Sequence, residues 1–160
     1  MTDEHGPDQG RRPPRAVSVS RVIAADRQEL FDVVADPAMH PVIDGSGSVR
    51  ATRGEDVARL AHGVSFGMRM RRGLAYPITN HVVEFVEGER IAWRHFHGHR
   101  WRYVFADVDA GTEVTETFDW STSRFPLGIE LMGFPAKNLA GMRETLARLE
   151  DLVVHGVVRR

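Results

Sequence analysis

The sequence predicts an α+β fold in which a curved antiparallel sheet wraps around one long helix. From about Val64 to Trp120, bulky apolar side chains recur at every second residue, as in strands that bury one face. This order of elements favours a sheet that curls around the helix and holds an apolar molecule between them. From Ala136 onward, apolar residues recur at the helical spacings of three and four, namely Leu139, Met142, Leu146, Leu149 and Val153.

Length and composition exclude several classes of function. The chain has 160 residues, enough for one domain with a real core, and its net charge of −1 gives no general attraction to nucleic acid or anionic membrane. It has no cysteine, which excludes disulfides, thiolate nucleophiles and cysteine-ligated metal sites. No apolar run approaches the roughly 20 residues of a membrane span, and the polar start has no signal-peptide core, so a cytoplasmic protein is expected.

The predicted elements follow from local patterns. Alternation indicates a first strand over 17–23, and Asp26 with Glu29 three residues later resembles a capping box for a short helix over 27–35. Pro37 ends that helix, since the residue before proline avoids helical backbone, and a further helical turn is expected over 37–40. The segment 125–134 is either a loop or a broken helical turn. The other strands are expected over 45–53, 64–70, 79–86, 90–96, 100–108 and 112–121, within one domain over 16–155 that has a disordered tail (1–15) and a short C-terminal tail (156–160).

The alternation also predicts which side chains share the inner face of the sheet. The apolar residues of four strands share one face if the connecting loops have suitable lengths. This requires an odd number of residues in the loops centred on Gly88 and Gly98, and an even number in the loop near Asp109-Ala110. Members of one layer touch, because adjacent strands lie about 4.8 Å apart. The predicted layers are Phe85, Ile91, Phe105 and Val114; then Val83, Trp93, Tyr103 and Glu116; then His81, His95, Trp101 and Phe118.

Polar side chains among these aromatics allow two interpretations. In the first, they are structural, with Arg21 paired to Glu116 and the histidines bonded to each other or to backbone. In the second, they line a partly wet cavity and orient a ligand, which the flexible methionines and large aromatics favour. Strand 79–86 is ambiguous, because Val82 and Val86 are equally placed to point inward and turn His81 outward. The candidate ligand-binding residues are Arg21, Phe66, Met68, Met70, His81, Trp93, His95, Trp101, Tyr103, Glu116, Phe118 and Met142.

Three short motifs do not indicate chemistry. His95, His97 and His99 have the spacing of metal ligands on one strand, but Gly98 breaks the run and no carboxylate completes the set. Residues 44–48, Asp-Gly-Ser-Gly-Ser, lack the features of a phosphate loop or a nucleophile elbow and are expected to form a flexible turn. The arginines of 68–72 form an exposed strand edge. The sequence therefore predicts no metal, no cofactor and no nucleic-acid partner.

Several stretches together resemble a known superfamily. The opening VSVSRVIAADRQELFDVVADPAMHPVIDGSG is similar to the start of the polyketide cyclase/dehydrase members of the START-like (SRPBCC, Bet v 1-like) superfamily. The stretches ITNHVVEFVEGERIAWRHF, HRWRYVF and GTEVTETFDW resemble the same group, and the C-terminal amphipathic helix completes the pattern over about 16–153. The resemblance implies a helix-grip fold: one strand, two small helices, six more antiparallel strands, and a long helix on the concave face above an apolar cavity.

The resemblance leaves three functions open. Its members include lipid and sterol carriers, plant hormone binders, aromatase/cyclases, quinone-binding proteins and co-chaperone-like domains. No invariant catalytic motif defines the group, so no catalytic residue is assigned. The first hypothesis is binding of a small hydrophobic molecule, such as a lipid, polyketide or aromatic metabolite. The second is a polyketide cyclase or dehydratase, and the third is an interaction module, for which the sequence predicts no apolar patch outside the cavity.

Overall fold

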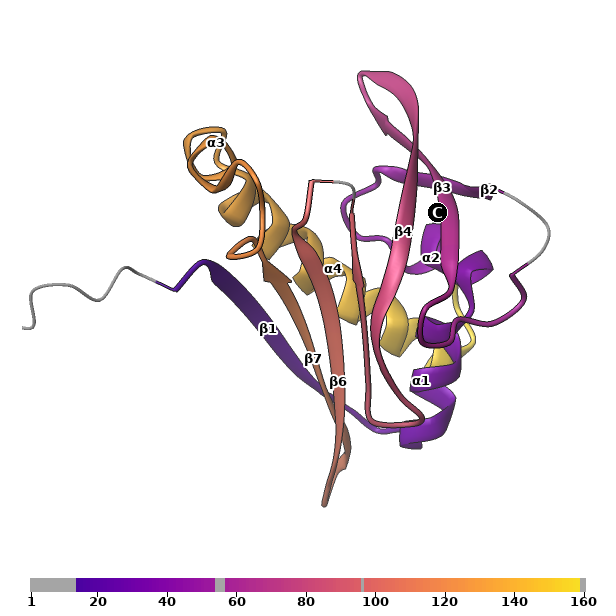
Figure 1. The fold of residues 1–160 in the computed structure, drawn as a ribbon. Helices are drawn as coiled ribbons and strands as arrows, with labels where there is room; N and C mark the ends of the chain where they lie inside the picture. The colour runs from indigo at the N-terminus through magenta and orange to yellow at the C-terminus, as the bar shows by residue number, and fades with distance from the viewer. Residues whose placement is uncertain (1–13, 54–56, 96, 159–160) are drawn as a thin grey trace, which may run out of the picture.

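A computed structural model describes residues 14–53, 57–95 and 97–158 of the chain (Figure 1). Seven strands form one antiparallel sheet in the order β1-β7-β6-β5-β4-β3-β2, which curls around a long C-terminal helix, as predicted. The strands are β1 (Ala16–Ile23), β2 (Val49–Arg53), β3 (Ser65–Arg72), β4 (Leu74–Val86), β5 (Arg90–Arg94), β6 (Arg100–Val108) and β7 (Gly111–Asp119). The helices are α1 (Arg27–Ala35), η1 (Pro37–Met39), α2 (His40–Ile43), α3 (Pro126–Leu131) and α4 (Phe134–His155).

Helix α4 packs on the concave face along its apolar stripe. Met142, Leu146 and Leu149 are buried, and the helix lies against β1 and β7. It begins directly after Gly133, with Pro135 in its first turn, and it ends at Gly156, whose φ of 64° suits glycine. No helix among the described residues is both long and apolar enough to cross a membrane.

A solid core fills one end of the space between the sheet and α4. Phe31 of α1 makes edge-to-face contacts with Phe85 and Phe105, each at 5.4 Å between ring centroids. Ile91 and Val114 are fully buried in the same cluster. These packed side chains fill this end, and the cavity described below lies toward the other end of α4.

The predicted strand register is confirmed in two hairpins and wrong by two residues in a third. Phe85 faces Ile91, and Phe105 faces Val114, as the loop parities require. Between β5 and β6, however, Trp93 faces Trp101 instead of Tyr103. The turn is closed by the bond from His95 N to His99 O, so Gly98, with φ of 91°, is its last residue and not its centre. The side chains of β6 still point to the predicted face of the sheet, because a shift of two residues does not change which side chains point inward.

A β-bulge in β4 overturns the inward placement of His81 and Val83. The register shifts between Val82 and Glu84, so that Val82 faces Trp93 and is buried. One extra residue reverses parity, and His81 therefore points outward, where its Nδ1 lies 2.7 Å from the Ser65 hydroxyl. Phe85, on the other side of the bulge, still points inward.

Other boundaries differ modestly from prediction. Helix α1 spans 27–35 as expected, and the Asp26 carboxylate accepts a hydrogen bond from Gln28 N at its start. Strand β4 begins at Leu74, five residues earlier than expected, because the hairpin turns at Gly73, whose φ is 79°. The ambiguous segment 125–134 contains the short helix α3. Most of the predicted tails, residues 1–13 and 159–160, lies outside the described residues.

The turn between α2 and β2 touches α4 through Gly45. A Cβ atom here would lie 2.4 Å from both the Gly141 carbonyl oxygen and the Thr145 backbone nitrogen. The Gly45 N–H donates to Thr145 Oγ1 at 2.9 Å, and Asp44 Oδ2 accepts from Val49 N at 2.7 Å. The expected turn is present, and glycine is needed at position 45 for a close approach of two backbones.

We predict that Gly45→Ala destabilises the fold by about 3 kcal/mol, because the added methyl group would force α4 away from the turn. Gly128→Ala is the matched control, since its Cβ would meet only Phe125 Cβ at 3.9 Å within α3. That variant is expected to be neutral or stabilised by at most about 1 kcal/mol. Urea denaturation of both variants measures the difference, and equal effects would contradict the close-packing argument.

Candidate functional site

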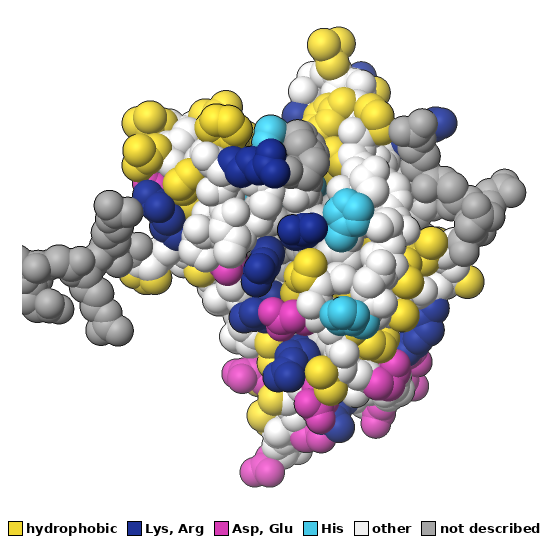
Figure 2. Space-filling model, in the orientation of Figure 1, with side chains coloured by type: hydrophobic (Ala, Val, Ile, Leu, Met, Phe, Trp, Pro, Cys, Tyr) yellow, Lys and Arg dark blue, Asp and Glu magenta, His cyan; other side chains and the backbone are white. Residues whose placement is uncertain are grey.

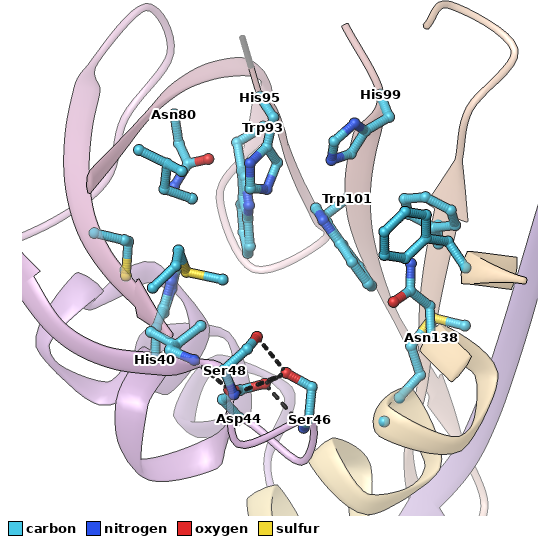
Figure 3. A pocket seen from close by; sticks show the side chains of 18 of the residues that line it. His40, Asp44, Ser46, Ser48, Asn80, Trp93, His95, His99, Trp101 and Asn138 are labelled. Atoms are coloured by element: carbon cyan, nitrogen blue, oxygen red, sulfur yellow. Dashed lines mark hydrogen bonds between the residues drawn. The ribbon is translucent and has the colours of Figure 1, made fainter. Parts of the chain in front are cut away.

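A cavity of about 530 Å³ lies between the sheet and α4, beyond the solid core (Figure 3). Trp93, His95 and Asn80 extend into it from the sheet, and Asn138 comes from α4. The α2–β2 turn supplies its base with Asp44, Ser46 and Ser48, which are linked by hydrogen bonds. At the other end the cavity is bordered by α3 and by the β3–β4 hairpin, which project on either side of it in Figure 1.

Aromatic and thioether side chains form most of the wall. Trp93 is stacked between Tyr103, at 5.6 Å between ring centroids, and His40, at 4.9 Å. Trp101 packs against Phe118 at 4.9 Å. Because rings in this arrangement support each other, the wall is a preformed apolar surface. Met68, Met70 and Met142 complete it.

The inner end of the cavity contains a buried acid. Glu116 on β7 is opposite Tyr103 on β6, and its side chain is 3 % exposed. Burial, the largest cause, raises the pKa of Glu116 to about 8; a hydrogen bond from the Tyr103 hydroxyl opposes the rise, and Asp44 adds to it. Burial and the neighbouring Glu116 raise the pKa of Tyr103 well above its usual value. Glu116 is therefore mainly protonated at neutral pH.

Histidines and an arginine lie at the outer end. The His95 and His99 rings stack at 4.5 Å, and the Arg72 guanidinium lies 5.2 Å from the Phe134 ring centre on α4. Burial lowers the pKa of His95 to about 3 and that of His99 to about 4; nearby histidines and Arg72 contribute to both shifts. Both imidazoles are thus neutral at pH 7, whereas Arg72 and Lys137, whose Nζ lies 5.9 Å from the Phe134 ring centre, carry positive charge near this end.

Three buried polar atoms of cavity-lining residues have no hydrogen-bond partner among the described residues: Asn80 Oδ1, Glu116 Oε2 and His99 Nδ1. Asn80 is 2 % exposed. An unsatisfied buried polar group costs about 1–3 kcal/mol, so such atoms in a cavity are suited to meeting a ligand.

The rim of the cavity is apolar, which corrects the expectation of no apolar patch. Large hydrophobic side chains project from α3 and from the tip of the β3–β4 hairpin, and they appear as two yellow groups at the top of Figure 2. The sequence argument considered only the outer face of the strands, whereas this patch comes from α3 with its flanking residues and from the first residues of β4. The exposed residues are Leu74, Tyr76, Phe125, Leu127, Leu131 and Met132.

The structure brings nine of the twelve candidate residues to the cavity and places three elsewhere. Arg21 points to the expected face, but its strand, β1, lies at the edge of the sheet. The Arg21 Nε atom donates to Glu150 on α4 at 2.7 Å, so Arg21 does not pair with Glu116. Phe66 is buried behind Trp93, and His81 points outward because of the bulge. The residues that line the cavity are Met68, Met70, Trp93, His95, Trp101, Tyr103, Glu116, Phe118 and Met142.

Several lining residues were missed by sequence reasoning. Asn138 lies four residues before Met142, so a polar residue on the apolar stripe of α4 was an available signal. Asn80 shares its parity with Val82, and the alternative register of β4 would have found it. His40 gave no signal, because it is positioned by its bond to the Val34 carbonyl at 2.8 Å across two helices. No group of three His, Asp or Glu able to hold a metal occurs in 14–53, 57–95 and 97–158.

Comparison with known proteins identifies the family. The family model described as "Polyketide cyclase / dehydrase and lipid transport" matches residues 14–154. The chain belongs to this family. It is also 40% identical over 149 residues to the uncharacterized protein Rv0088 of Mycobacterium tuberculosis. That match covers 89% of this chain and 66% of the relative, so the chain spans slightly less than two thirds of the relative's length.

Solved structures of the family's fold are also similar. A protein of Rhodobacter sphaeroides has a TM-score of 0.69 at 18% identity, covering 91% of this chain and 96% of that one. An AHSA1-like protein of Aeromonas hydrophila has a TM-score of 0.65 at 20% identity, covering 88% and 93%. At these identities the likeness establishes the fold alone. The family match over residues 14–154 is what confirms the polyketide cyclase/dehydrase resemblance recognised in the sequence.

We predict that Glu116 gives the protein a falling stability above pH 6.5. The folded state keeps the proton up to a pKa of about 8, whereas the unfolded state loses it near 4.5, so the unfolded state binds fewer protons in between. The free energy of unfolding therefore falls as pH rises, approaching about 1.4 kcal/mol per pH unit, and levels off above 8. The pKa values of His40, His95 and His99 are lowered in the folded state, so these groups affect stability only below about pH 6.5. In that range the free energy of unfolding increases as pH rises.

Urea titrations at pH 6.5, 7.5 and 8.5 measure this slope. Glu116→Gln removes the titrating group and is expected to flatten it, whereas Glu113→Gln, on the exposed face of β7, is expected to leave it unchanged. A wild-type slope identical to that of Glu116→Gln would show that the carboxyl ionises normally.

Proposed function

We propose that the protein binds a small, largely apolar molecule, such as a lipid, a polyketide or an aromatic metabolite, in the cavity between the sheet and α4. The observation that carries the proposal is the cavity of about 530 Å³, walled by aromatic and methionine side chains. Small-molecule sites in proteins commonly measure about 300–1,000 Å³ and combine such walls with a few polar groups.

Burial of apolar surface would supply most of the affinity. A ligand that loses about 250 Å² of apolar surface to the cavity gains roughly 6 kcal/mol. Association costs several kcal/mol in lost motion, so apolar contact alone gives a modest affinity and little discrimination between ligands of similar shape. Discrimination then falls to the buried polar groups, of which Glu116 and Asn80 have unpartnered atoms.

Filling the cavity tests this function. We predict that the uncharged fluorescent probe N-phenyl-1-naphthylamine binds the wild type at one site, and that Met70→Trp weakens its binding at least about tenfold, or about 1.4 kcal/mol. Met70 lines the cavity from β3, so an indole there would occupy the space of the ligand. Fluorescence titration measures both affinities.

Val104→Trp is the matched control, because it adds the same indole on the exposed outer face of β6. It should bind the probe as the wild type does. An absence of saturable binding to the wild type, or equal loss in both variants, would contradict a ligand site in the cavity.

A second candidate, a polyketide cyclase or dehydratase, is favoured by the position of Glu116. Its pKa of about 8 lies near working pH, which suits a group that donates or removes a proton. The neighbouring Tyr103 hydrogen-bonds Glu116, and the cavity would hold a poly-β-keto chain in a folded shape beside them. The family description names both activities, cyclase/dehydrase and lipid transport.

For this candidate we predict that Glu116→Gln lowers the rate of cyclisation or dehydration of a short poly-β-keto thioester by about 10²–10⁴-fold, the usual contribution of a general acid–base group. Product formation is followed by mass spectrometry, with Glu113→Gln as control. If wild type and Glu116→Gln form product at the same rate as buffer alone, the protein binds without catalysing this reaction.

A further inference from the structure

The chemical character of the inner end of the cavity depends on which groups surround Glu116. On β6 the facing residue is Tyr103, and on the neighbouring strand β1 it is Val19. From the α2–β2 turn the facing charge is Asp44, which raises the pKa of both Glu116 and Tyr103. The titratable His40 also lines the cavity, with Nε2 2.8 Å from the Val34 carbonyl oxygen. The residues that α4 contributes to the cavity carry no charge: Phe134, Asn138, Gly141, Met142 and Thr145.

Among the described residues, no cation compensates Glu116. Arg21, the nearest candidate by register, is bonded to Glu150. Arg72 acts at the outer end, where it affects His95 and His99. A buried carboxyl with a negative neighbour and no cation retains its proton, and a protonated carboxyl is a hydrogen-bond donor.

The hydrogen bonds already made leave one atom of Glu116 to be satisfied. The Tyr103 hydroxyl donates to the carboxyl, so it uses acceptor capacity. Oε2 is fully buried and has no partner in the described part of the chain. A proton on Oε2 therefore needs an acceptor, and the cavity is where that acceptor can come from.

We propose, on the basis of the proposed function, that the cavity selects ligands whose inner end is an uncharged carbonyl oxygen, as in a ketone, aldehyde or ester, which accepts a hydrogen bond from Glu116. A ligand carboxylate or phosphate at this end would lose its hydration beside the negative Asp44 and is rejected. A ligand ammonium must pass Arg72 at the outer end and lose its hydration among Trp93, Trp101 and Phe118, so it is disfavoured as well.

Four naphthalene compounds of nearly equal shape test the proposal by displacing N-phenyl-1-naphthylamine. 2-Acetylnaphthalene carries the carbonyl, and 2-isopropenylnaphthalene replaces its oxygen by a methylene group. 2-Naphthoate and 2-naphthylmethylamine carry a negative and a positive charge. At pH 6.5 the ketone is expected to bind the wild type about tenfold more tightly than the hydrocarbon, the effect of one well-formed hydrogen bond, and more tightly than either ion.

Variants at position 116 separate the hydrogen bond from the shape of the cavity. Glu116→Gln keeps a donor, so the preference for the ketone remains at pH 6.5 but loses its pH dependence. In the wild type the preference falls as pH rises above 8, because an ionised Glu116 donates nothing. Glu116→Leu is expected to abolish the preference while still binding the hydrocarbon, and Glu113→Gln should behave as the wild type.

The outcomes distinguish this inference from the proposed function. If ketone and hydrocarbon bind the wild type equally, or if an ion binds more tightly than the ketone, the inference is overturned while a ligand cavity remains. If neither the probe nor any of the four compounds binds, both are overturned. If Glu116→Leu does not fold, the pH dependence in the wild type against Glu116→Gln still decides.

Discussion

The site depends on how closely α4 approaches the turn between α2 and β2. At Gly45 the two backbones touch, with room for no side chain, and this contact sets the height of the helix above the sheet. Farther along α4, Leu146 and Leu149 are fully buried in the core that Phe31 completes. The helix is therefore held at one end by the core and near its middle by the turn, and the space beyond them is the cavity.

Much of the fold was predictable because it follows from the alternation of apolar residues in the strands and their spacing of three and four in α4. The alternation over β6 and β7 placed Tyr103 opposite Glu116, and the spacing in α4 placed Met142 on its buried face. What failed was decided by single residues. One extra residue near Val83 reversed His81, and the edge position of β1 gave Arg21 a partner on α4. The adjacent Val82 and Val83 made the register of β4 ambiguous in the sequence, but the pattern alone could not choose between the two registers, and nothing in it indicated the partner of Arg21.

The buried polar groups divide into those that serve the fold and those that face the cavity. The Asp44 carboxylate accepts hydrogen bonds from Ser46 and from the Val49 backbone, which fix the shape of the turn, and Thr145 of α4 accepts a hydrogen bond from Gly45 N. Glu116 and Asn80 instead keep unpartnered atoms at a cost in stability. A fold maintained only for stability would have replaced them with apolar residues, so their position in the cavity wall is the feature that ties the family's architecture to chemistry.

The bulge in β4 divides that strand into two segments of opposite parity. The first turns Ile78, Asn80 and Val82 toward the interior, and the second turns Phe85 toward the solid core. A substitution in either segment changes one side chain and leaves the direction of its neighbours unchanged. Without the extra residue Val83, Val82 would still lie opposite Trp93 and Glu84 opposite Ala92, so regular alternation would carry both segments with their present inward side chains. The bulge is therefore what lets two stretches of opposite parity, one bordering the cavity and one in the solid core, bury their side chains on the same face of the sheet.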